Sequence, residues 1–206
     1  MDDSSEEIMR CLFQTVGVLV DAAGMQESYA SRHRLRTSQI VRTMAQLLGF
    51  EAVGIDGIRM AATLHDIGNI LLPPGLLAKP DRFTAEEAAI MQQHVAQGAE
   101  ILGNIDFPWP VVPIILQHHE RLDGSGYPNG LKGGEIMLEA QILGVADVVE
   151  AMTSPRPWRE ALPVETALEE IVRGRGITFD PFAVDSCVEL FTNQAHRLDP
   201  EYYGRE

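Results

Sequence analysis

Residues 58–69 read IRMAATLHDIGN, and this stretch decides the fold class. One side of it repeats at positions i, i+3, i+4 and i+7, the spacing of an amphipathic helix, and consists of Ile58, Ala61, Ala62 and His65. We therefore predict a helix that begins after Asp56 and runs to about Asn69. In this helix His65 belongs to the side that faces the core, and Asp66 lies beside it.

Helical periodicity continues outward from this stretch over most of the chain, and the sequence contains no long alternating strand pattern. Helix starts are marked by capping boxes at Ser4–Glu7 and Thr84–Glu87 and by the pair Asp180–Pro181. The further helices are expected over residues 4–24, 31–48, 84–103, 110–119, 136–152, 164–174 and 181–195. The sequence thus predicts an all-α fold with one domain over 26–206, preceded by an N-terminal helix, 1–25, that serves as a linker or dimer element.

The composition is that of a globular protein, with 206 residues, 30 acidic and 16 basic side chains and a formal charge of −14. This acidity argues against duplex nucleic acid as a partner, since phosphate backbones need clustered Lys and Arg, but a small anionic ligand in a local pocket remains compatible with it. The acidic N-terminus is unlike a signal peptide, and the apolar run 11–20 is too short for a membrane span. We expect a soluble, cytoplasmic protein with no membrane partner.

Residues with metal-binding chemistry fall on the core-facing sides of several predicted helices. His94 and Asp147 each share a side with apolar residues, and His118 and His119 end an apolar run. Taken singly, each imidazole is an ordinary hydrogen-bonded core or surface group. Taken together, buried carboxylates near several imidazoles are costly unless cations lie between them, and both groups suit Fe, Mn or Zn. Helical bundles build dinuclear centres in this way, and a carboxylate such as that of Asp66 can bridge two metals.

Several motifs resemble those of the HD-GYP family, which are HD-superfamily phosphohydrolases that cleave cyclic di-GMP. The stretch HHERLDGSGYPNGLKGGEI, residues 118–136, resembles the family signature almost throughout, and LHDIGN, residues 64–69, resembles its LHDIGK motif. Further motifs are matched by residues 76–102, 146–161 and 176–181. The resemblance spans about residues 27–191 and implies an all-α HD-superfamily helical bundle with a dinuclear metal site in its core.

The resemblance also implies the ligands of two divalent transition-metal ions, position by position. Those of one ion are His33, His65 and Asp147, and those of the other are His94, His118 and His119. Asp66 is the expected bridging ligand, and iron is the expected metal, with manganese as the alternative. A hydroxide held between two such cations is a nucleophile at neutral pH, because the metals lower the pKa of bound water. Attack on cyclic di-GMP would give linear pGpG, and the end product is either pGpG or the GMP formed from it in a second step.

Four further residues are implied to face the substrate. Arg156 and Arg159 match family positions whose guanidinium groups suit a phosphate or a guanine edge. Gly126 and Tyr127 belong to the GYP loop, where glycine allows close backbone approach and tyrosine offers a hydroxyl or a ring that stacks on a base. Without the resemblance, the arginines would be read as a solvated pair and the loop as a surface turn.

This sequence departs from the family pattern at several positions. We expect catalytic roles at Asp66 and Asn69, but Asn69 stands where the family has a lysine, which weakens electrostatic stabilisation of the transition state. Lys79, in the following motif, is not an obvious substitute. Tyr29 stands where some members have a glutamate that binds a third metal, which favours a dinuclear site. Conservative replacements are Trp158 for tyrosine and Glu150 for aspartate.

Three functions compete on these observations. The first is a cyclic di-GMP phosphodiesterase, favoured by the complete set of predicted ligands. The second is a weak or inactive module that binds cyclic di-GMP or a protein of the signalling pathway, suggested by Asn69. The third is hydrolysis of another nucleotide. In addition, the first helix carries Ile8, Leu12, Thr15, Val16 and Leu19 on one side. This side mediates a homodimer or packs on its own domain, and we favour the latter slightly.

Overall fold

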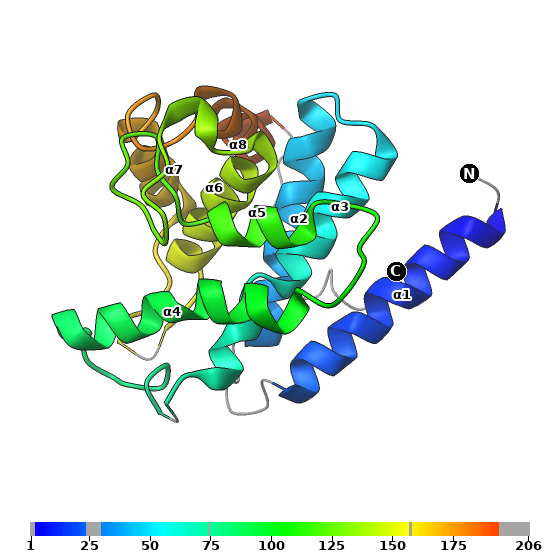
Figure 1. Ribbon diagram of the computed structural model, residues 1–206. Coiled ribbons are helices and arrows are strands. Elements are labelled where there is room, and N and C mark those ends of the chain that lie inside the picture. Colours follow the sequence, from blue (N-terminus) through cyan, green and yellow to red (C-terminus); the bar gives the residue numbers. More distant parts are fainter. Residues whose placement is uncertain (1–2, 24–29, 74, 157, 194–206) are drawn as a thin grey trace.

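A computed structural model describes residues 3–23, 30–73, 75–156 and 158–193 of the chain (Figure 1). These residues form helices and connecting loops, and no β-strand occurs among them. The α-helices are α1 (Asp3–Ala23), α2 (Ala30–Leu47), α3 (Ala52–Leu64), α4 (Ala85–Leu102), α5 (Val111–Gln117), α6 (Leu138–Thr153), α7 (Val164–Arg173) and α8 (Pro181–Asn193). Two short 3₁₀ helices, η1 (Ile67–Leu71) and η2 (Gly133–Glu135), lie between them. The all-α prediction is therefore confirmed.

Two of the three predicted helix starts are confirmed. The Thr84 hydroxyl accepts a hydrogen bond from the Glu87 backbone, and the Glu87 carboxylate accepts one from the Thr84 backbone. Asp180 Oδ1 accepts from the second and third residues of α8, at 2.8 and 3.0 Å. The start at Ser4 is wrong, because α1 begins at Asp3 and Ser4 already lies inside it.

The single helix predicted to begin after Asp56 and end near Asn69 is also wrong. Helix α3 begins at Ala52 and ends at Leu64, and a turn at His65 and Asp66 separates it from η1. The backbone of Asp66, at φ −98° and ψ 7°, lies outside the helical region. After this turn, Gly68 lies close against α4, where a Cβ would lie 2.0 Å from the carbonyl oxygen of His94.

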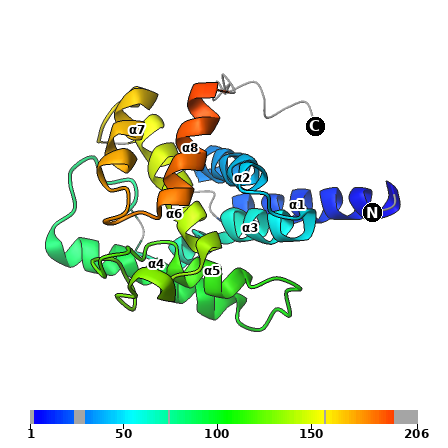
Figure 2. The ribbon, with the colours of Figure 1, turned by 90° about the horizontal axis from the view of Figure 1, so that it is seen from above.

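Helices α2, α3, α5 and α6 enclose the core (Figures 1 and 2). Helix α2 packs against α3, α6 and α8, and α5 lies across α3, α4 and α6. Fully buried side chains at the centre include Ile40, Met44, Ile58, Ile115 and Leu143. Burying each of these stabilises the fold by about 1.5–3 kcal/mol. Several polar side chains share this interior, which is where the predicted site lies.

Helix α1 lies along α2 and α3 and extends beyond the bundle (Figure 2). It packs on the core through Phe13, Val16 and Val20. Four other apolar residues of α1 face solvent: Ile8, Leu12, Val18 and Leu19 are 65%, 41%, 67% and 64% exposed. Of the predicted apolar side, only Val16 therefore faces the domain. The predicted boundary at residues 25 and 26 falls outside the described residues and stays a prediction.

None of the helices in the described ranges is long and apolar enough to cross a lipid bilayer. The cytoplasmic location stays a prediction. Tyr29, which bears on the expected absence of a third metal, lies outside the described residues.

Candidate metal centre

Seven predicted metal ligands, distant in sequence, converge inside the bundle. Helix α2 supplies His33, the turn after α3 supplies His65 and Asp66, and α4 supplies His94. The segment after α5 supplies His118 and His119, and α6 supplies Asp147. The side chains of His33, His65 and His94 are 5% exposed or less, whereas that of Asp66 is 38% exposed. The cluster is therefore buried and opens to solvent beside Asp66.

One half of the cluster, which we call the carboxylate triad, consists of His33, His65 and Asp147. Asp147 Oδ1 lies 3.2 Å from His33 Nε2 and 3.8 Å from His65 Nε2. The two Nε2 atoms lie 3.3 Å apart. His33 and His65, taken with Asp66, also have ligand atoms that all lie within 4.8 Å of one another. This half can hold one metal ion.

The other half, the imidazole triad, consists of His94, His118 and His119. Their ligand atoms lie within 4.8 Å of one another. Their ring centroids are separated by 5.8 Å, 5.3 Å and 4.0 Å. This half supplies three nitrogen atoms and no carboxylate of its own, a donor set that suits a transition metal better than Mg²⁺ or Ca²⁺.

The Asp66 carboxylate lies between the two triads. Its Oδ2 atom lies 3.5 Å from His65 Nε2 and 3.7 Å from His33 Nε2. Its Oδ1 atom lies 3.6 Å from His94 Nε2. One oxygen thus faces each triad, which is the placement that a bridging ligand needs.

Three of the imidazoles are oriented by backbone hydrogen bonds three residues back along the chain. The Nδ1 atoms of His65, His94 and His118 donate to the carbonyl oxygens of Ala62, Met91 and Ile115, at 2.8, 2.6 and 2.6 Å. Each ring therefore turns Nε2, with its lone pair, toward the cluster. The buried Nε2 atoms of His94 and His118 have no hydrogen-bond partner among the described residues. An unpaired buried lone pair costs free energy, and a metal ion would satisfy it.

The two triads differ in charge. Burial opposes protonation of His33, but Asp147 and Glu150 outweigh it and raise the pKa of this imidazole to about 10. Burial lowers the pKa of His119 to about 3, with Asp147 opposing and His94 adding to the shift. Burial likewise lowers the pKa of His118 well below its usual value. In the metal-free protein at neutral pH, His118 and His119 are therefore held neutral while His33 is protonated.

Two glycines allow the elements that bear the ligands to approach closely. Gly68 lies against the backbone of His94, as described above. Gly144, on α6 one turn before Asp147, lies against the backbone of His118, and a Cβ there would meet the His118 carbonyl oxygen at 2.4 Å. Any larger side chain would push α6 away from the segment after α5 and separate Asp147 from the imidazole triad.

The GYP loop folds back onto the imidazole triad. The ring of Tyr127 stacks on that of His119, with centroids 4.7 Å apart, and the Tyr127 backbone N–H donates to the His119 carbonyl oxygen. Gly126 permits this approach, because a Cβ there would lie 2.4 Å from the same oxygen. The buried carboxylate of Glu120 holds the loop by accepting from the backbone N–H groups of Asn129 and Leu131 at 2.7 and 3.0 Å. The structural role of Glu120 was not anticipated from the sequence.

The two predicted substrate arginines differ. The guanidinium of Arg159 donates to carbonyl oxygens around the C-terminal end of α6, including those of Ala151 and Met152. The Arg156 guanidinium instead lies 3.9 Å from Glu150 Oε2. Arg159 thus caps a helix, and its contact with substrate stays a prediction.

Asn69 lies in η1, and its backbone N–H donates to the Asp66 carbonyl oxygen at 2.9 Å. Its side-chain Oδ1 is buried without a hydrogen-bond partner among the described residues. Lys79 is held by Glu87, whose carboxylate oxygens lie 2.8 and 2.7 Å from Nζ. The Lys79 ammonium is thus engaged by a carboxylate of α4, and its not replacing the family lysine stays a prediction.

Sequence comparison matches residues 17–182 to the HD domain family. The cyclic di-GMP phosphodiesterase response regulator RpfG of Xanthomonas campestris is 39% identical over 177 residues, or 85% of this chain and 47% of that protein. A cyclic di-GMP phosphodiesterase of Thermotoga maritima is 38% identical over 181 residues, or 87% of this chain and 49% of that protein. The 3′3′-cGAMP-specific phosphodiesterase 2 of Vibrio cholerae is 34% identical over 173 residues, or 83% of this chain and 33% of that protein. The chain thus spans at most about half the length of these relatives.

Two solved structures share the fold. Bd1817, an HDG"Y"P protein from Bdellovibrio bacteriovorus, superposes with a TM-score of 0.68 at 21% identity, covering 91% of this chain and 68% of that one. The cyclic GMP-AMP-specific phosphodiesterase V-cGAP3 of Vibrio cholerae gives a TM-score of 0.64 at 19% identity, covering 89% and 49%. At these identities, the likeness supports the helical architecture alone.

Proposed function

Because this chain belongs to the HD superfamily, as an HD-GYP domain, we propose that it is a metal-dependent phosphodiesterase that hydrolyses cyclic di-GMP to pGpG, with pGpG or GMP as the end product. The observation that carries this proposal is the convergence of seven potential ligands, two of which have buried Nε2 atoms without a hydrogen-bond partner among the described residues. Relatives at 38% and 39% identity act on the same substrate by name.

We assign one ion to the carboxylate triad and the other to the imidazole triad, with Asp66 facing both. When bound, two divalent ions supply an activated water and positive charge for the phosphoryl oxygens. Asp66, at the solvent-open side of the cluster, lies where a phosphodiester enters. Iron is the metal that we propose, with manganese as the alternative, since imidazole and carboxylate ligands suit both.

The remaining predicted residues act around the phosphodiester. Arg156 provides a guanidinium that pairs with a phosphate oxygen. Tyr127 already covers one face of His119 with its ring, so we assign it to the wall of the site beside that ligand. Asn69 can donate a hydrogen bond to the reacting phosphate but brings no charge.

The test is turnover of cyclic di-GMP by the protein reconstituted anaerobically with Fe²⁺ or aerobically with Mn²⁺, with pGpG and GMP separated by chromatography. We expect pGpG to appear with either metal and to vanish after chelation. Protein that holds two ions, binds cyclic di-GMP and releases no pGpG would contradict the enzyme proposal. Faster cleavage of 3′3′-cGAMP, the substrate named for one relative, would replace the substrate assignment.

A second candidate is a weak or inactive module that binds cyclic di-GMP or a signalling protein. The observation in its favour is Asn69, together with the engagement of Lys79 by Glu87. The variant Asn69→Lys distinguishes the two. For an enzyme that lacks only this charge, kcat rises by about tenfold, which corresponds to about 1.4 kcal/mol of transition-state stabilisation. No turnover in either protein favours the binding module.

We propose that the exposed side of α1 forms the interface of a homodimer. Ile8, Leu12, Thr15 and Leu19 follow the alternating spacing of four and three that a coiled-coil seam uses, and the apolar three are exposed. Light scattering on the eluting protein should give twice the chain mass, and Leu12→Ser with Leu19→Ser should halve it. Val172→Ser, an exposed position on α7, is the matched control. A monomeric wild-type protein would exclude the dimer.

A further inference from the structure

Glu150 is a buried carboxylate that the proposed function leaves without a role. It lies on α6, three residues after Asp147, and is fully buried. Its Oε2 atom accepts a hydrogen bond from His33 Nδ1, and its Oε1 atom accepts one from Ser154 Oγ at 2.5 Å. Two arginines also approach it: Arg36 Nε lies 3.4 Å from Oε1 and Arg156 NH2 lies 3.9 Å from Oε2.

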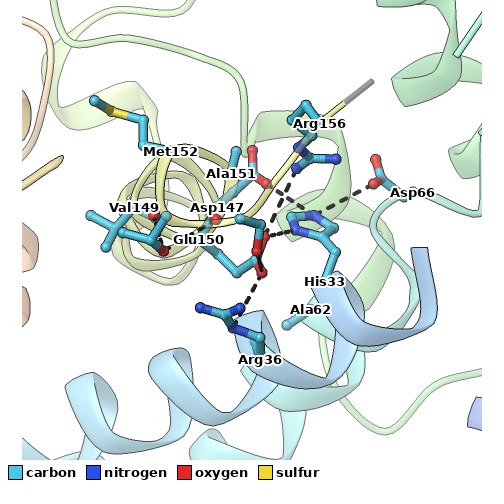
Figure 3. A network of polar contacts seen from close by, with 12 residues as sticks. His33, Arg36, Ala62, Asp66, Asp147, Val149, Glu150, Ala151, Met152 and Arg156 are labelled. Carbon is cyan, nitrogen blue, oxygen red and sulfur yellow. Dashed lines mark hydrogen bonds and ion pairs between the residues drawn. The ribbon is translucent and has the colours of Figure 1, made fainter. Parts of the chain in front are cut away.

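Figure 3 shows the Glu150 carboxylate between the guanidinium groups of Arg36 and Arg156, with the ring of His33 beside it. A buried carboxylate is strongly destabilising unless charged or hydrogen-bonding partners compensate for its lost hydration. His33 and Ser154 bond to the Glu150 carboxylate, and the guanidinium groups of Arg36 and Arg156 lie beside it, so these four partners compensate for its burial. The carboxylate can therefore act as a fixed acceptor.

The contact with His33 determines the orientation of its ring. Whereas His65, His94 and His118 donate Nδ1 to a carbonyl of their own helix or turn, His33 donates Nδ1 to a carboxylate from another helix. Nε2 of the same ring faces Asp147 at 3.2 Å, so α6 contacts both ring nitrogens. A metal-bound imidazole that donates its second N–H to a carboxylate is held in one tautomer and one orientation, and it is a stronger ligand.

We propose that Glu150 is a positioning residue that orients His33 for the metal of the carboxylate triad and anchors the guanidinium of Arg156 at the edge of the site. This inference rests on the proposed function, since it assumes two metal ions and a phosphate-bearing substrate. Glu150 contacts both His33, a proposed metal ligand on α2, and Arg156, the proposed substrate-binding residue after α6. One carboxylate then controls metal affinity at the carboxylate triad and also substrate binding.

The test compares Glu150→Gln, which keeps the shape and removes the charge, with Glu150→Asp, which keeps the charge. Binding of Mn²⁺ is measured by calorimetry on chelator-treated protein, and KM and kcat for cyclic di-GMP are measured at saturating Mn²⁺. In Glu150→Gln, the affinity for one of the two Mn²⁺ ions should fall by about 10–100-fold, and the affinity for the other should stay unchanged. KM should rise by about tenfold, because Arg156 loses its ion pair, and Glu150→Asp should restore part of both losses. Glu169→Gln, an exposed glutamate on α7, is the control.

The outcomes separate this inference from the proposed function. Wild-type protein that binds no Mn²⁺ overturns the proposed function itself. Two ions bound equally well by wild type and by Glu150→Gln overturn the positioning role, as does equal weakening of both ions, which indicates general damage to the fold. If Glu150→Gln does not fold, Ser154→Ala removes one donor to the same carboxylate. A weakening of one ion by about threefold in that variant supports the inference, and unchanged binding of both overturns it.

Discussion

The carboxylate triad and the imidazole triad lie side by side in one buried cluster, yet they offer a metal ion different chemistry. His33 in the first is protonated without metal, because Asp147 and Glu150 surround it, and its pKa is raised to about 10. His119 in the second is neutral without metal, because burial lowers its pKa to about 3. In the part of the chain that the structure describes, the second triad has two buried Nε2 atoms without a hydrogen-bond partner, on His94 and His118, and the first has none.

The difference shows that the metal-ligating side chains of one cluster are kept in place in two ways before metal binds. The carboxylate triad satisfies its own polar atoms by internal ion pairs, so a metal must displace a proton from His33. The imidazole triad leaves two buried Nε2 atoms without a hydrogen-bond partner among the described residues, so a bound metal would give their lone pairs a partner. At neutral pH we therefore expect metal binding to release no proton from His118 and His119, and to release about one proton from His33 in the carboxylate triad.

The largest expected effect comes from Asp66, which faces both triads. Asp66→Asn removes the charge between the two ions while keeping the shape of the side chain. We expect bound metal to fall at both triads and turnover of cyclic di-GMP to fall by about 10³-fold or more. Metal content by mass spectrometry and pGpG formation check this. Full occupancy of both sites in Asp66→Asn would show that each triad holds its metal independently.

A matched pair of substitutions disrupts one triad at a time. Asp147→Asn removes the carboxylate of one triad, and His119→Gln removes a nitrogen ligand of the other. Each variant should keep one of the two ions and lose about 10²-fold in kcat, because a single remaining ion stabilises less phosphoryl charge. Only the wild type and His119→Gln should release about one proton on binding Mn²⁺, measured by calorimetry in buffers of different ionisation enthalpy. Proton release by Asp147→Asn equal to that of the wild type would contradict the asymmetry.

A third substitution tests the contact between Gly144 on α6 and the backbone of His118, which brings the two triads together. A Cβ in Gly144→Ala would meet the His118 carbonyl oxygen at 2.4 Å, so overpacking should lower the free energy of unfolding by about 1–3 kcal/mol. Gly54→Ala on α3 is the control, since its Cβ meets only the edge of the Phe50 ring at 3.3 Å and gains helix propensity. Urea denaturation of metal-free protein measures both. Equal stability of the two variants would mean that α6 tolerates displacement.

Much of this site could be predicted from local pattern. Helical periodicity places His65, His94 and Asp147 on core-facing sides, and the HD-GYP motifs name the remaining ligands by position. The break after Leu64 could not be predicted in this way, because the apolar spacing continues through His65. The close approach of Gly68 to α4 after the break is likewise a property of the packed bundle, which local spacing does not contain.

Glu150 shows the same limit at the site. In the sequence it is only a longer residue at an aspartate position, and nothing local links it to His33, which lies 117 residues away. Its role depends on the packing of α6 against α2, which brings Arg36 and His33 to the same carboxylate. Helix α1 is a further example, because its apolar residues lie on two sides and periodicity alone does not select the side that packs.

The last expected effect is a pH dependence of stability that belongs to one triad alone. The pKa of His33 is raised to about 10 in the folded, metal-free protein, so its proton contributes stability below pH 6.5 that is lost as the pH rises through 10. The slope between these values is at most about 1.4 kcal/mol per pH unit. Thermal unfolding of metal-free His33→Asn should lack this loss, whereas His119→Asn, whose imidazole is already neutral, should keep it. If both variants lose stability in parallel with the wild type, the charge on His33 is not what distinguishes the two triads.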